Sequence, residues 1–285
     1  MNLWDMNTIK GVLSRHGFHF SKSLGQNFLI NPDVCPHMAA ECRADGGGVL
    51  EVGPGVGILT AELAKRAGKV VSVELDKRLI PVLDETLADF SNVKIVLDDI
   101  LKTDLKTLME TEFPGQEIAV CANLPYYITS PVIMRLLEER LPIHSITVMV
   151  QKEAAERLCA QPGSRACGAV SAAVRYFAEP EILFQVGREN FYPQPNVDST
   201  VIRLNVLKEP PVRVDEEKDF FRVVKAAFGQ RRKTVLNALS SGLSFHRETI
   251  ALALERAGIA SNARAEQLTM DQLAASCNEL SSENE

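Results

Sequence analysis

The sequence lacks any uninterrupted apolar run of the roughly 18–20 residues that a membrane-spanning helix needs. Its first 30 residues also lack the apolar core of a signal peptide, and they contain Lys10, Arg15, His16 and His19 instead. These absences predict a cytoplasmic protein that has no membrane partner.

The cysteines lack the spacing of a metal site. None of the six forms a C-x-x-C pair, and no histidine lies beside them at a zinc-like distance. We therefore expect no bound metal, and cysteines that act as small buried side chains in a reducing cell.

Basic residues are fewer than acidic ones: 31 Lys and Arg against 37 Asp and Glu give a net charge of −6 over 285 residues. This balance argues against a protein that coats nucleic acid without specificity. The length is enough for one large domain or two smaller ones.

Short apolar runs alternate with helical patterns in the first two thirds of the chain. Strands are predicted at 49–52, 69–73, 93–97, 117–121 and 145–150, with helices at 58–66, 78–89 and 130–140. Two further strands, at 181–187 and 200–206, follow as an antiparallel hairpin that closes the sheet edge. Strands alternating with helices predict an α/β fold with a mostly parallel, seven-stranded sheet covered on both faces.

The pattern changes at residues 208–211, Lys-Glu-Pro-Pro. Helices are predicted afterwards at 216–228, 232–240, 247–257 and 270–280. Gly258 is placed to end the third, and Thr269 with Gln272 forms a capping box for the fourth. We expect an α/β domain over 1–207 and a small all-helical domain over 208–285.

A glycine-rich loop, residues 51–57, follows the first strand and opens a helix. A dinucleotide fingerprint would require glycine at position 58 or 60, where the chain has Ile58 and Thr60. The loop instead suits a nucleoside ligand without a pyrophosphate, such as S-adenosylmethionine, with Gly53 and Gly55 close to it. Alone, such a turn is equally typical of a purely structural bend.

Two acids follow the next two strands. Glu74 is placed to accept both ribose hydroxyl protons, and Asp99 to accept a proton from the adenine amino group. Each alone is compatible with a solvated strand end. Because open α/β sheets bind ligands at the carboxyl edge of their strands, their coincidence with the glycine loop favours a binding site.

The tetrapeptide Asn123-Leu124-Pro125-Tyr126 follows the fourth strand. An exocyclic amine on a base is a poor nucleophile, because its lone pair is delocalised into the ring. An Asn oxygen and a backbone carbonyl beside Pro125 can accept its two N–H bonds and direct the lone pair at a methyl sulfonium. Pro125 stiffens the turn, and Tyr126 can stack on a base taken out of its helix.

Phe191 precedes a loop with prolines at 193 and 195. It is a candidate for the opposite wall of a base sandwich, where stacking contributes roughly 1–3 kcal/mol. Without residues 123–126, Phe191 would be interpreted as a core residue.

At this point the chain resembles the ribosomal RNA adenine dimethyltransferases. The resemblance rests on six segments that occur in order, at 22–29, 51–57, 123–129, 151–153, 191–199 and 228–233. It implies a Rossmann-like methyltransferase domain and transfer of methyl groups from S-adenosylmethionine to N6 of two adjacent adenosines. In the family these lie in a hairpin loop near the 3′ end of 16S rRNA, each becomes dimethylated, and the reaction belongs to small-subunit biogenesis.

The resemblance also implies site residues. Asn27, Leu29, Gly53, Gly55, Glu74, Asp99 and Asn123 are expected to contact the cofactor. The tetrapeptide 123–126 is expected to hold the target adenine, with Phe191 stacking on it.

Basic residues cluster in three windows without acids, 6–32, 157–178 and 220–247. The third window predicts phosphate contacts with RNA by Arg222, Lys225, Arg231, Arg232 and Lys233. A solvated basic helix face is the alternative for these residues. We expect a monomer whose partner is the small ribosomal subunit or its precursor.

Three other functions remain open. A large-subunit rRNA adenine methyltransferase shares the same active-site logic, although the helical C-terminal domain and segment 228–233 favour the small-subunit enzyme. An RNA-binding assembly factor without catalysis would not need an intact 123–126 motif. A nicotinamide oxidoreductase is disfavoured by Ile58 and Thr60.

Overall fold

The computed structural model describes residues 1–18 and 27–282. The chain divides into two compact units, of which the first comprises Met1–Ala155 and Pro180–Val206. The second comprises Glu156–Glu179 and Leu207–Glu285. The sequence predicts a boundary at residue 207 and assigns 156–179 to the α/β domain. In the structure, residues 156–179 belong to the helical unit instead, because their helix at 169–177 packs on the helix at 217–228.

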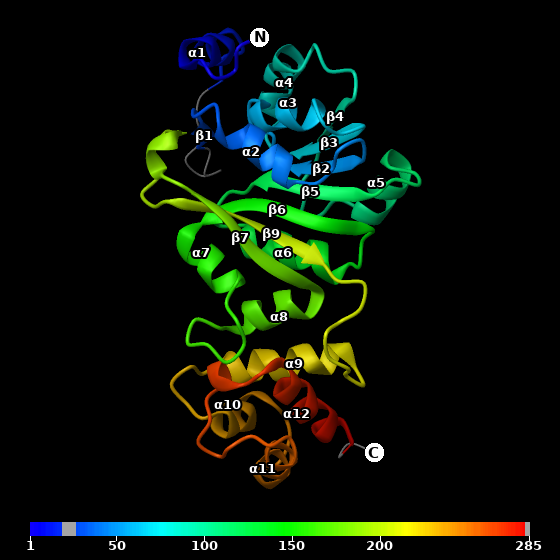
Figure 1. The fold of residues 1–285 in the computed structure, drawn as a ribbon, viewed down its shortest axis with the longest axis vertical. Helices are drawn as coiled ribbons and strands as arrows, with labels where there is room; N and C mark the ends of the chain where they lie inside the picture. Colours follow the sequence, from blue (N-terminus) through cyan, green and yellow to red (C-terminus); the bar gives the residue numbers. More distant parts are fainter. Residues whose placement is uncertain (19–26, 283–285) are drawn as a thin grey trace. The chain divides into compact units, whose positions relative to one another are not determined.

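A seven-stranded sheet forms the centre of the first unit, in the order β4-β3-β2-β5-β6-β9-β7 (Figure 1). Strands β2 to β6 pair in parallel, and β9 pairs antiparallel with β6. The bounds are β2 Gly48–Val52, β3 Lys69–Glu74, β4 Val93–Leu97, β5 Ile118–Asn123, β6 Ile143–Gln151, β7 Ala178–Val186 and β9 Ser199–Val206. The predicted Rossmann-like architecture is confirmed, and each predicted strand overlaps an observed one.

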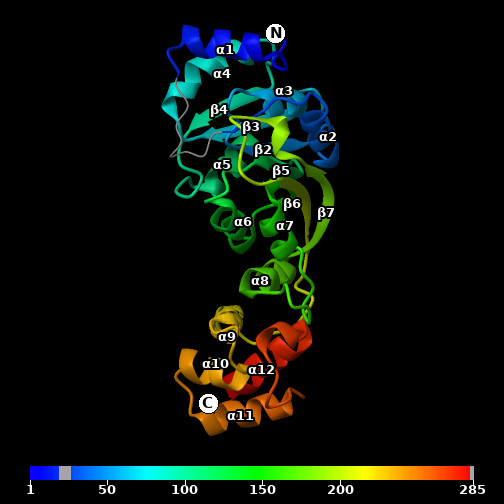
Figure 2. The same ribbon diagram turned by 90° about the vertical axis from the view of Figure 1, so that its left-hand side faces the viewer.

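Helices lie on both faces of this sheet. The helices up to residue 158 are α1 Met6–Arg15, α2 Val34–Glu41, α3 Ile58–Ala64, α4 Ile80–Thr86, α5 Leu105–Glu112, α6 Thr129–Glu138 and α7 Lys152–Leu158, and α1 packs on α4. In Figure 2, α2 and α3 lie on one side of the central strands, and α5 and α6 lie on the other. Strands β2 and β5 are buried along nearly their whole length, because helices cover both faces.

The sequence does not predict α1, α2, α5, α7 or, in the second unit, α8. They have between seven and ten residues, but so do α3, α4 and α6, which are predicted, so length alone does not set them apart. Two of them begin at a side-chain cap: the Asp5 carboxylate accepts backbone N–H bonds at the start of α1, and Asp104 does the same for α5.

The strand register brings the predicted site residues to one edge of the sheet. Val52, at the end of β2, lies between Val73 of β3 and Ala122 of β5. Glu74 pairs with Leu97, the last residue of β4. Gly53, Glu74, Asp99 and Asn123 therefore all lie at or just beyond the carboxyl ends of four adjacent parallel strands.

A second, two-stranded sheet joins distant segments of the first unit. β1 (Phe28–Leu29) pairs antiparallel with β8 (Phe191–Tyr192), so that Leu29 lies opposite Phe191. The sequence does not predict this pairing, because two-residue strands leave no periodic signal.

The second unit is helical over its described residues. Its helices are α8 Ala169–Phe177, α9 Glu217–Phe228, α10 Val235–Gly242, α11 Arg247–Arg256 and α12 Met270–Ser282. Gly258 adopts a left-handed φ of 67° just after α11, as predicted. The predicted capping box is also present, with both Thr269–Gln272 bonds at 3.2 Å. Tyr176 and Phe177 of α8 pack against Phe220 and Phe221 of α9.

Across residues 1–18 and 27–282, no helix is long and apolar enough to cross a membrane. The same ranges contain no group of three or more His, Cys, Asp or Glu that could hold a metal ion.

Candidate active site

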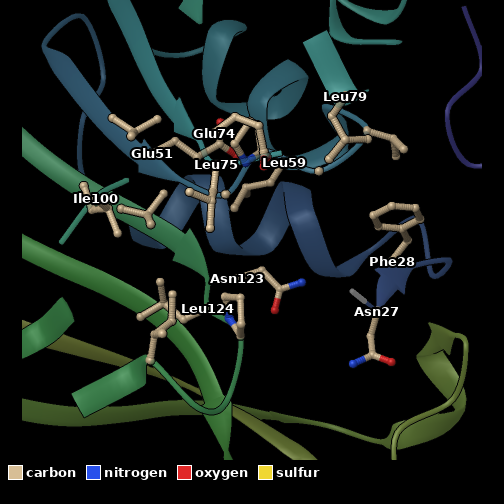
Figure 3. Close-up of a pocket in the computed structure, with 18 of the residues that line it drawn as sticks. Asn27, Phe28, Glu51, Leu59, Glu74, Leu75, Leu79, Ile100, Asn123 and Leu124 are labelled. Atoms are coloured by element: carbon tan, nitrogen blue, oxygen red, sulfur yellow. The ribbon is translucent and has the colours of Figure 1, made fainter. Parts of the chain in front are cut away.

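A cavity of about 300 Å³ lies at the carboxyl edge of the sheet (Figure 3). Its walls come from the ends of β2, β3 and β5, from the turn after β4, and from β1 and β8. The volume lies at the lower end of the range for small-molecule sites. All predicted cofactor and base residues line this cavity: Asn27, Leu29, Gly53, Gly55, Glu74, Asp99, Asn123, Leu124, Pro125, Tyr126 and Phe191.

The glycine loop forms the floor between β2 and α3. Gly53 and Gly55 have left-handed φ values of 69° and 61°, which other residues adopt only with strain. A Cβ at Gly55 would approach the Phe28 ring to 3.2 Å, so the loop backbone packs closely under β1. The glycines thus let the main chain itself line the cavity.

Glu51 is a candidate that the sequence reasoning missed. It is 1% exposed and lines the cavity from within β2. One carboxylate oxygen, Oε2, accepts hydrogen bonds from Ser72 Oγ at 2.6 Å and Thr60 Oγ1 at 2.7 Å. The other, Oε1, has no partner among the described residues. A glutamate inside the otherwise apolar run 48–52 was the signal that could have identified it.

Burial raises the pKa of the Glu51 carboxyl to about 7. An unpartnered buried carboxylate oxygen is costly unless a ligand supplies a donor. A cationic ammonium would satisfy Oε1 and stabilise the ionised form. This arrangement fits the amino group of S-adenosylmethionine.

Glu74 is fixed at the end of β3. Its Oε1 accepts the Asp76 backbone N–H at 2.7 Å, and the residue is only 6% exposed. Burial raises the pKa of Glu74, and backbone N–H donors partly offset that shift. A carboxylate held this rigidly can accept bonds from the two hydroxyls of a ribose.

Asp99 lies two residues beyond β4, in a tight turn. Its Oδ1 accepts the Leu101 backbone N–H at 3.0 Å, and Lys102 Nζ lies 3.4 Å from Oδ2. The neighbouring Asp98 also lines the cavity. The turn therefore presents two acids and the side chains of Ile100 and Leu101 to a ligand.

The tetrapeptide 123–126 links β5 to α6. The Asn123 side chain makes no hydrogen bond to any residue of the described chain, and Figure 3 shows its carboxamide pointing towards the side of the cavity where Asn27 lies. The Pro125 carbonyl accepts the Ile128 N–H at 3.1 Å, whereas the Leu124 carbonyl has no donor within the described ranges. Two acceptors, Asn123 Oδ1 and Leu124 O, thus remain for a ligand amine.

The aromatic residues of the site have different environments. The Tyr126 hydroxyl lies 3.0 Å from Ser199 Oγ, which anchors this half-buried ring to β9. Phe191 is 4% exposed, so it is packed in the core and lines the cavity at the same time. Tyr127, which the sequence does not single out, is 58% exposed at the cavity wall.

The basic residues predicted to contact RNA belong to the second unit and are all exposed. Arg222 forms an ion pair with Asp219 at 2.8 Å, and Arg231 Nη2 donates to the Arg165 carbonyl at 3.1 Å. Arg175 of the 157–178 window is a structural residue instead: its guanidinium donates to the carbonyls of Cys159 and Ala160. Residues 22–26 of the resemblance lie outside the described ranges.

Comparisons with known proteins identify the family of this chain. Residues 17–282 match the family described as ribosomal RNA adenine dimethylase. Ribosomal RNA small subunit methyltransferase A from Alkaliphilus oremlandii (strain OhILAs) is 47% identical over 273 residues, which cover 95% of each chain.

Two solved structures extend the comparison. The 23S rRNA methyltransferase ErmE is 27% identical, with a TM-score of 0.68 over 89% of this chain and 99% of its own. A dimethyladenosine transferase from Plasmodium falciparum is 24% identical, with a TM-score of 0.75 over 90% and 98%. At this level of identity, the Plasmodium falciparum structure supports only the assignment of the fold.

The Rossmann-like sheet and the cavity at its carboxyl edge, together with these relatives, define an S-adenosylmethionine-dependent methyltransferase. The chain belongs to the ribosomal RNA adenine dimethylase family. Its substrate is therefore ribosomal RNA.

Proposed function

We propose that this enzyme methylates N6 of two adjacent adenosines in a hairpin loop near the 3′ end of 16S rRNA and dimethylates each of them. The relative from Alkaliphilus oremlandii, which matches over 95% of both chains, carries the small-subunit name. The proposal places the reaction in small-subunit biogenesis, in the cytoplasm, with a monomeric enzyme.

The observation that carries the chemistry is the pair of free acceptors at the end of β5. Asn123 Oδ1 and the Leu124 carbonyl lack partners among the described residues, and both residues line the cavity. Accepting the two N–H bonds of an adenine amine withdraws its lone pair from the ring and directs it at the methyl donor. No general base is required, because the methylated ammonium product is acidic and loses its proton readily.

The remaining residues orient the two reactants. Bound S-adenosylmethionine supplies an electrophilic methyl group. Glu51 Oε1 would accept from its ammonium, Glu74 from its ribose, and Asp99 from its adenine, while Gly53 and Gly55 allow close approach of the main chain. Asn27 and Leu29 would close the site from β1, and Tyr126 and Phe191 would hold the target base between aromatic rings.

The basic residues of the second unit would contact RNA phosphates. Arg222, Lys225, Arg231, Arg232 and Lys233 are exposed and lie on α9 or in the turn after it. Phosphate contacts supply affinity and orientation but carry no sequence information, so this surface fits recognition of a folded RNA by shape.

The test uses labelled S-adenosylmethionine with isolated ribosomal subunits from cells that lack the modification. We expect methyl groups to enter small subunits and not large ones. Incorporation into large subunits alone would favour the activity of the ErmE type, and binding to subunits without any transfer would favour an assembly factor.

A further inference from the structure

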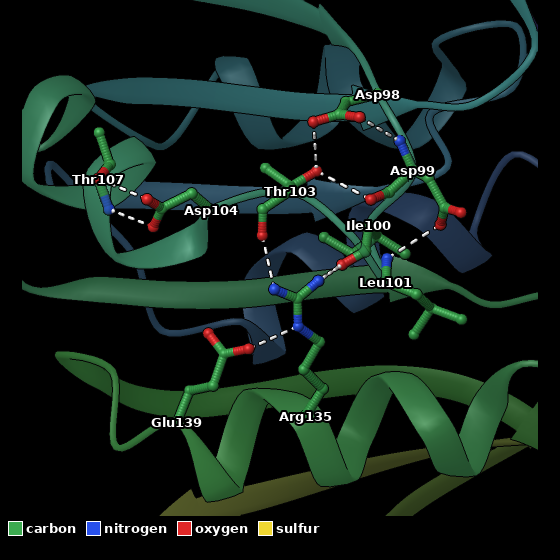
Figure 4. Close-up of polar contacts among 9 residues, drawn as sticks. All are labelled: Asp98, Asp99, Ile100, Leu101, Thr103, Asp104, Thr107, Arg135 and Glu139. Carbon is green, nitrogen blue, oxygen red and sulfur yellow. Dashed lines mark hydrogen bonds and ion pairs between the residues drawn. The ribbon is translucent and has the colours of Figure 1, made fainter.

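A single arginine connects the two halves of the cavity wall. The turn 98–101 contributes four cavity residues on the cofactor side, and Asn123 to Tyr126 form the wall on the side of the target base. Arg135, on the helix that follows the base-side motif, reaches across to the turn (Figure 4).

Hydrogen bonds within the turn satisfy only some of its backbone carbonyls. Thr103 Oγ1 lies 2.9 Å from Asp98 Oδ2 and 3.0 Å from the Asp99 carbonyl oxygen, so its single proton is shared between these two acceptors. The Asp99 carbonyl also accepts the backbone N–H groups of Lys102 and Thr103. These bonds close the turn but leave the carbonyls of Ile100 and Thr103 without a partner inside it.

Arg135 supplies the missing donors. Its Nη1 donates to the Ile100 carbonyl, and its Nη2 donates to the Thr103 carbonyl at 2.6 Å. Its Nε donates to Oε1 of Glu139, the C-cap residue of α6, at 2.5 Å. All three guanidinium nitrogens are thus engaged, which suits the planar donor fork of arginine.

The connection continues into the base-side motif through α6. This helix begins at Thr129, and the Pro125 carbonyl accepts both the Ile128 N–H and the Thr129 hydroxyl proton. The motif is therefore hydrogen-bonded to the start of the helix that carries Arg135.

We propose that Arg135 is a positioning residue, which holds the cofactor-side turn carrying Asp99 in a fixed place relative to Asn123. Asp99 and the acceptors of the motif must hold two different molecules at the distance of a methyl transfer. Such geometry requires that the two walls do not move independently.

The test begins with binding of S-adenosylhomocysteine to the full chain, measured by calorimetry without RNA. We expect Arg135→Met to raise the dissociation constant about tenfold, because two charge-assisted bonds to the turn are lost. We expect Arg135→Lys to fall between wild type and Arg135→Met, since one ammonium can replace only part of the fork. Glu139→Gln is the control, because it keeps both bonds to the turn and should bind as wild type does.

Kinetics with the RNA substrate separate positioning from general damage. Arg135→Met should raise the KM for S-adenosylmethionine and should also lower kcat at saturating cofactor, because the bound methyl donor would be held less firmly against the target amine. A fall in kcat that saturation does not relieve, with KM unchanged, would contradict the proposal.

A double-mutant cycle with Asp99→Asn tests the route of the effect. If Arg135 acts through the turn, Arg135→Lys should weaken binding far less in the Asp99→Asn background than in wild type. Additive effects within about twofold would overturn the proposal, as would unchanged binding in both Arg135 variants. The inference relies on the proposed function for its target base, but this binding assay needs no RNA and so can fail independently.

Discussion

At the scale of single residues, the site combines side chains that the sequence identifies with side chains that it does not. Asn123, Glu74 and Asp99 follow strands that apolar runs reveal, and so their positions could be predicted. Glu51 and Arg135 could not be assigned roles. The role of Glu51 depends on a carboxylate oxygen that the fold leaves without a partner. The role of Arg135 depends on hydrogen bonds to two backbone carbonyls more than 30 residues earlier in the chain.

Asn123→Ala removes one of the two acceptors for the target amine. We expect kcat to fall by about 10²–10³, the usual effect of losing one preorganised polar group at a reacting centre. Binding of S-adenosylhomocysteine and the thermal unfolding midpoint should change little by comparison. Asn262→Ala, an exposed asparagine of the second unit, is the matched control. Near-normal turnover of Asn123→Ala would mean that another group holds the amine.

Glu51→Gln tests the unpartnered carboxylate oxygen. The amide oxygen can still accept from Ser72 and Thr60, which leaves the NH₂ group in the place of Oε1. We expect S-adenosylhomocysteine to bind about tenfold more weakly or worse, because a donor would then face the ligand ammonium. Glu110→Gln, an exposed residue of α5, is the control. Unchanged affinity would place the ammonium elsewhere.

The raised pKa of Glu51 makes the stability of the fold depend on pH, and Glu51→Gln tests this dependence. Burial raises the pKa of Glu51 from 4.5 to about 7, so the folded chain keeps a proton that the unfolded chain releases. The ligand-free protein should therefore lose stability as the pH rises from 4.5 to 7, by roughly 3 kcal/mol from this group. Denaturant unfolding at pH 5.5 and 8 should show a smaller difference in Glu51→Gln than in wild type. An equal difference would contradict the assignment.

At the scale of elements, the sheet was far more predictable than the helices around it. Strands such as β4 are apolar runs bounded by turn residues, and the predicted range 93–97 coincides with the observed strand. The sequence does not predict the short helices α5 and α7, whereas the glycine loop marks the start of α3, a helix of similar length. The β1–β8 pairing brings together residues more than 160 positions apart, which no local pattern encodes.

The turn after α9 is the element best placed to test RNA contact. We expect the combined change of Arg231, Arg232 and Lys233 to Ala to weaken RNA binding and to reduce its salt slope by about 1–3. The fold should persist, because all three side chains are exposed.

The matched control changes three exposed basic residues of the first unit, Lys65, Arg66 and Lys106, to Ala. It alters net charge equally, so its binding should change less than that of the first variant. Equal losses would show that overall charge, and not this turn, governs RNA affinity.

At the scale of the whole molecule, a net charge of −6 does not describe how the protein meets a polyanion. Basic residues concentrate on α9 and the turn after it, whereas buried acids such as Glu51 and Glu74 line the cavity. The charge balance excludes an indiscriminate RNA coat but permits one basic contact surface. Counting basic residues in the sequence overestimates that surface, because the Arg175 guanidinium donates to the backbone carbonyls of Cys159 and Ala160.

The most direct test of the whole account is base-resolved analysis of the methylated RNA. Small subunits lacking the modification are incubated with enzyme and S-adenosylmethionine, and the RNA is digested and examined by mass spectrometry. We expect N6,N6-dimethyladenosine at two adjacent positions near the 3′ end of 16S rRNA. Methylation of any other atom or base, or of 23S rRNA in its place, would contradict this expectation.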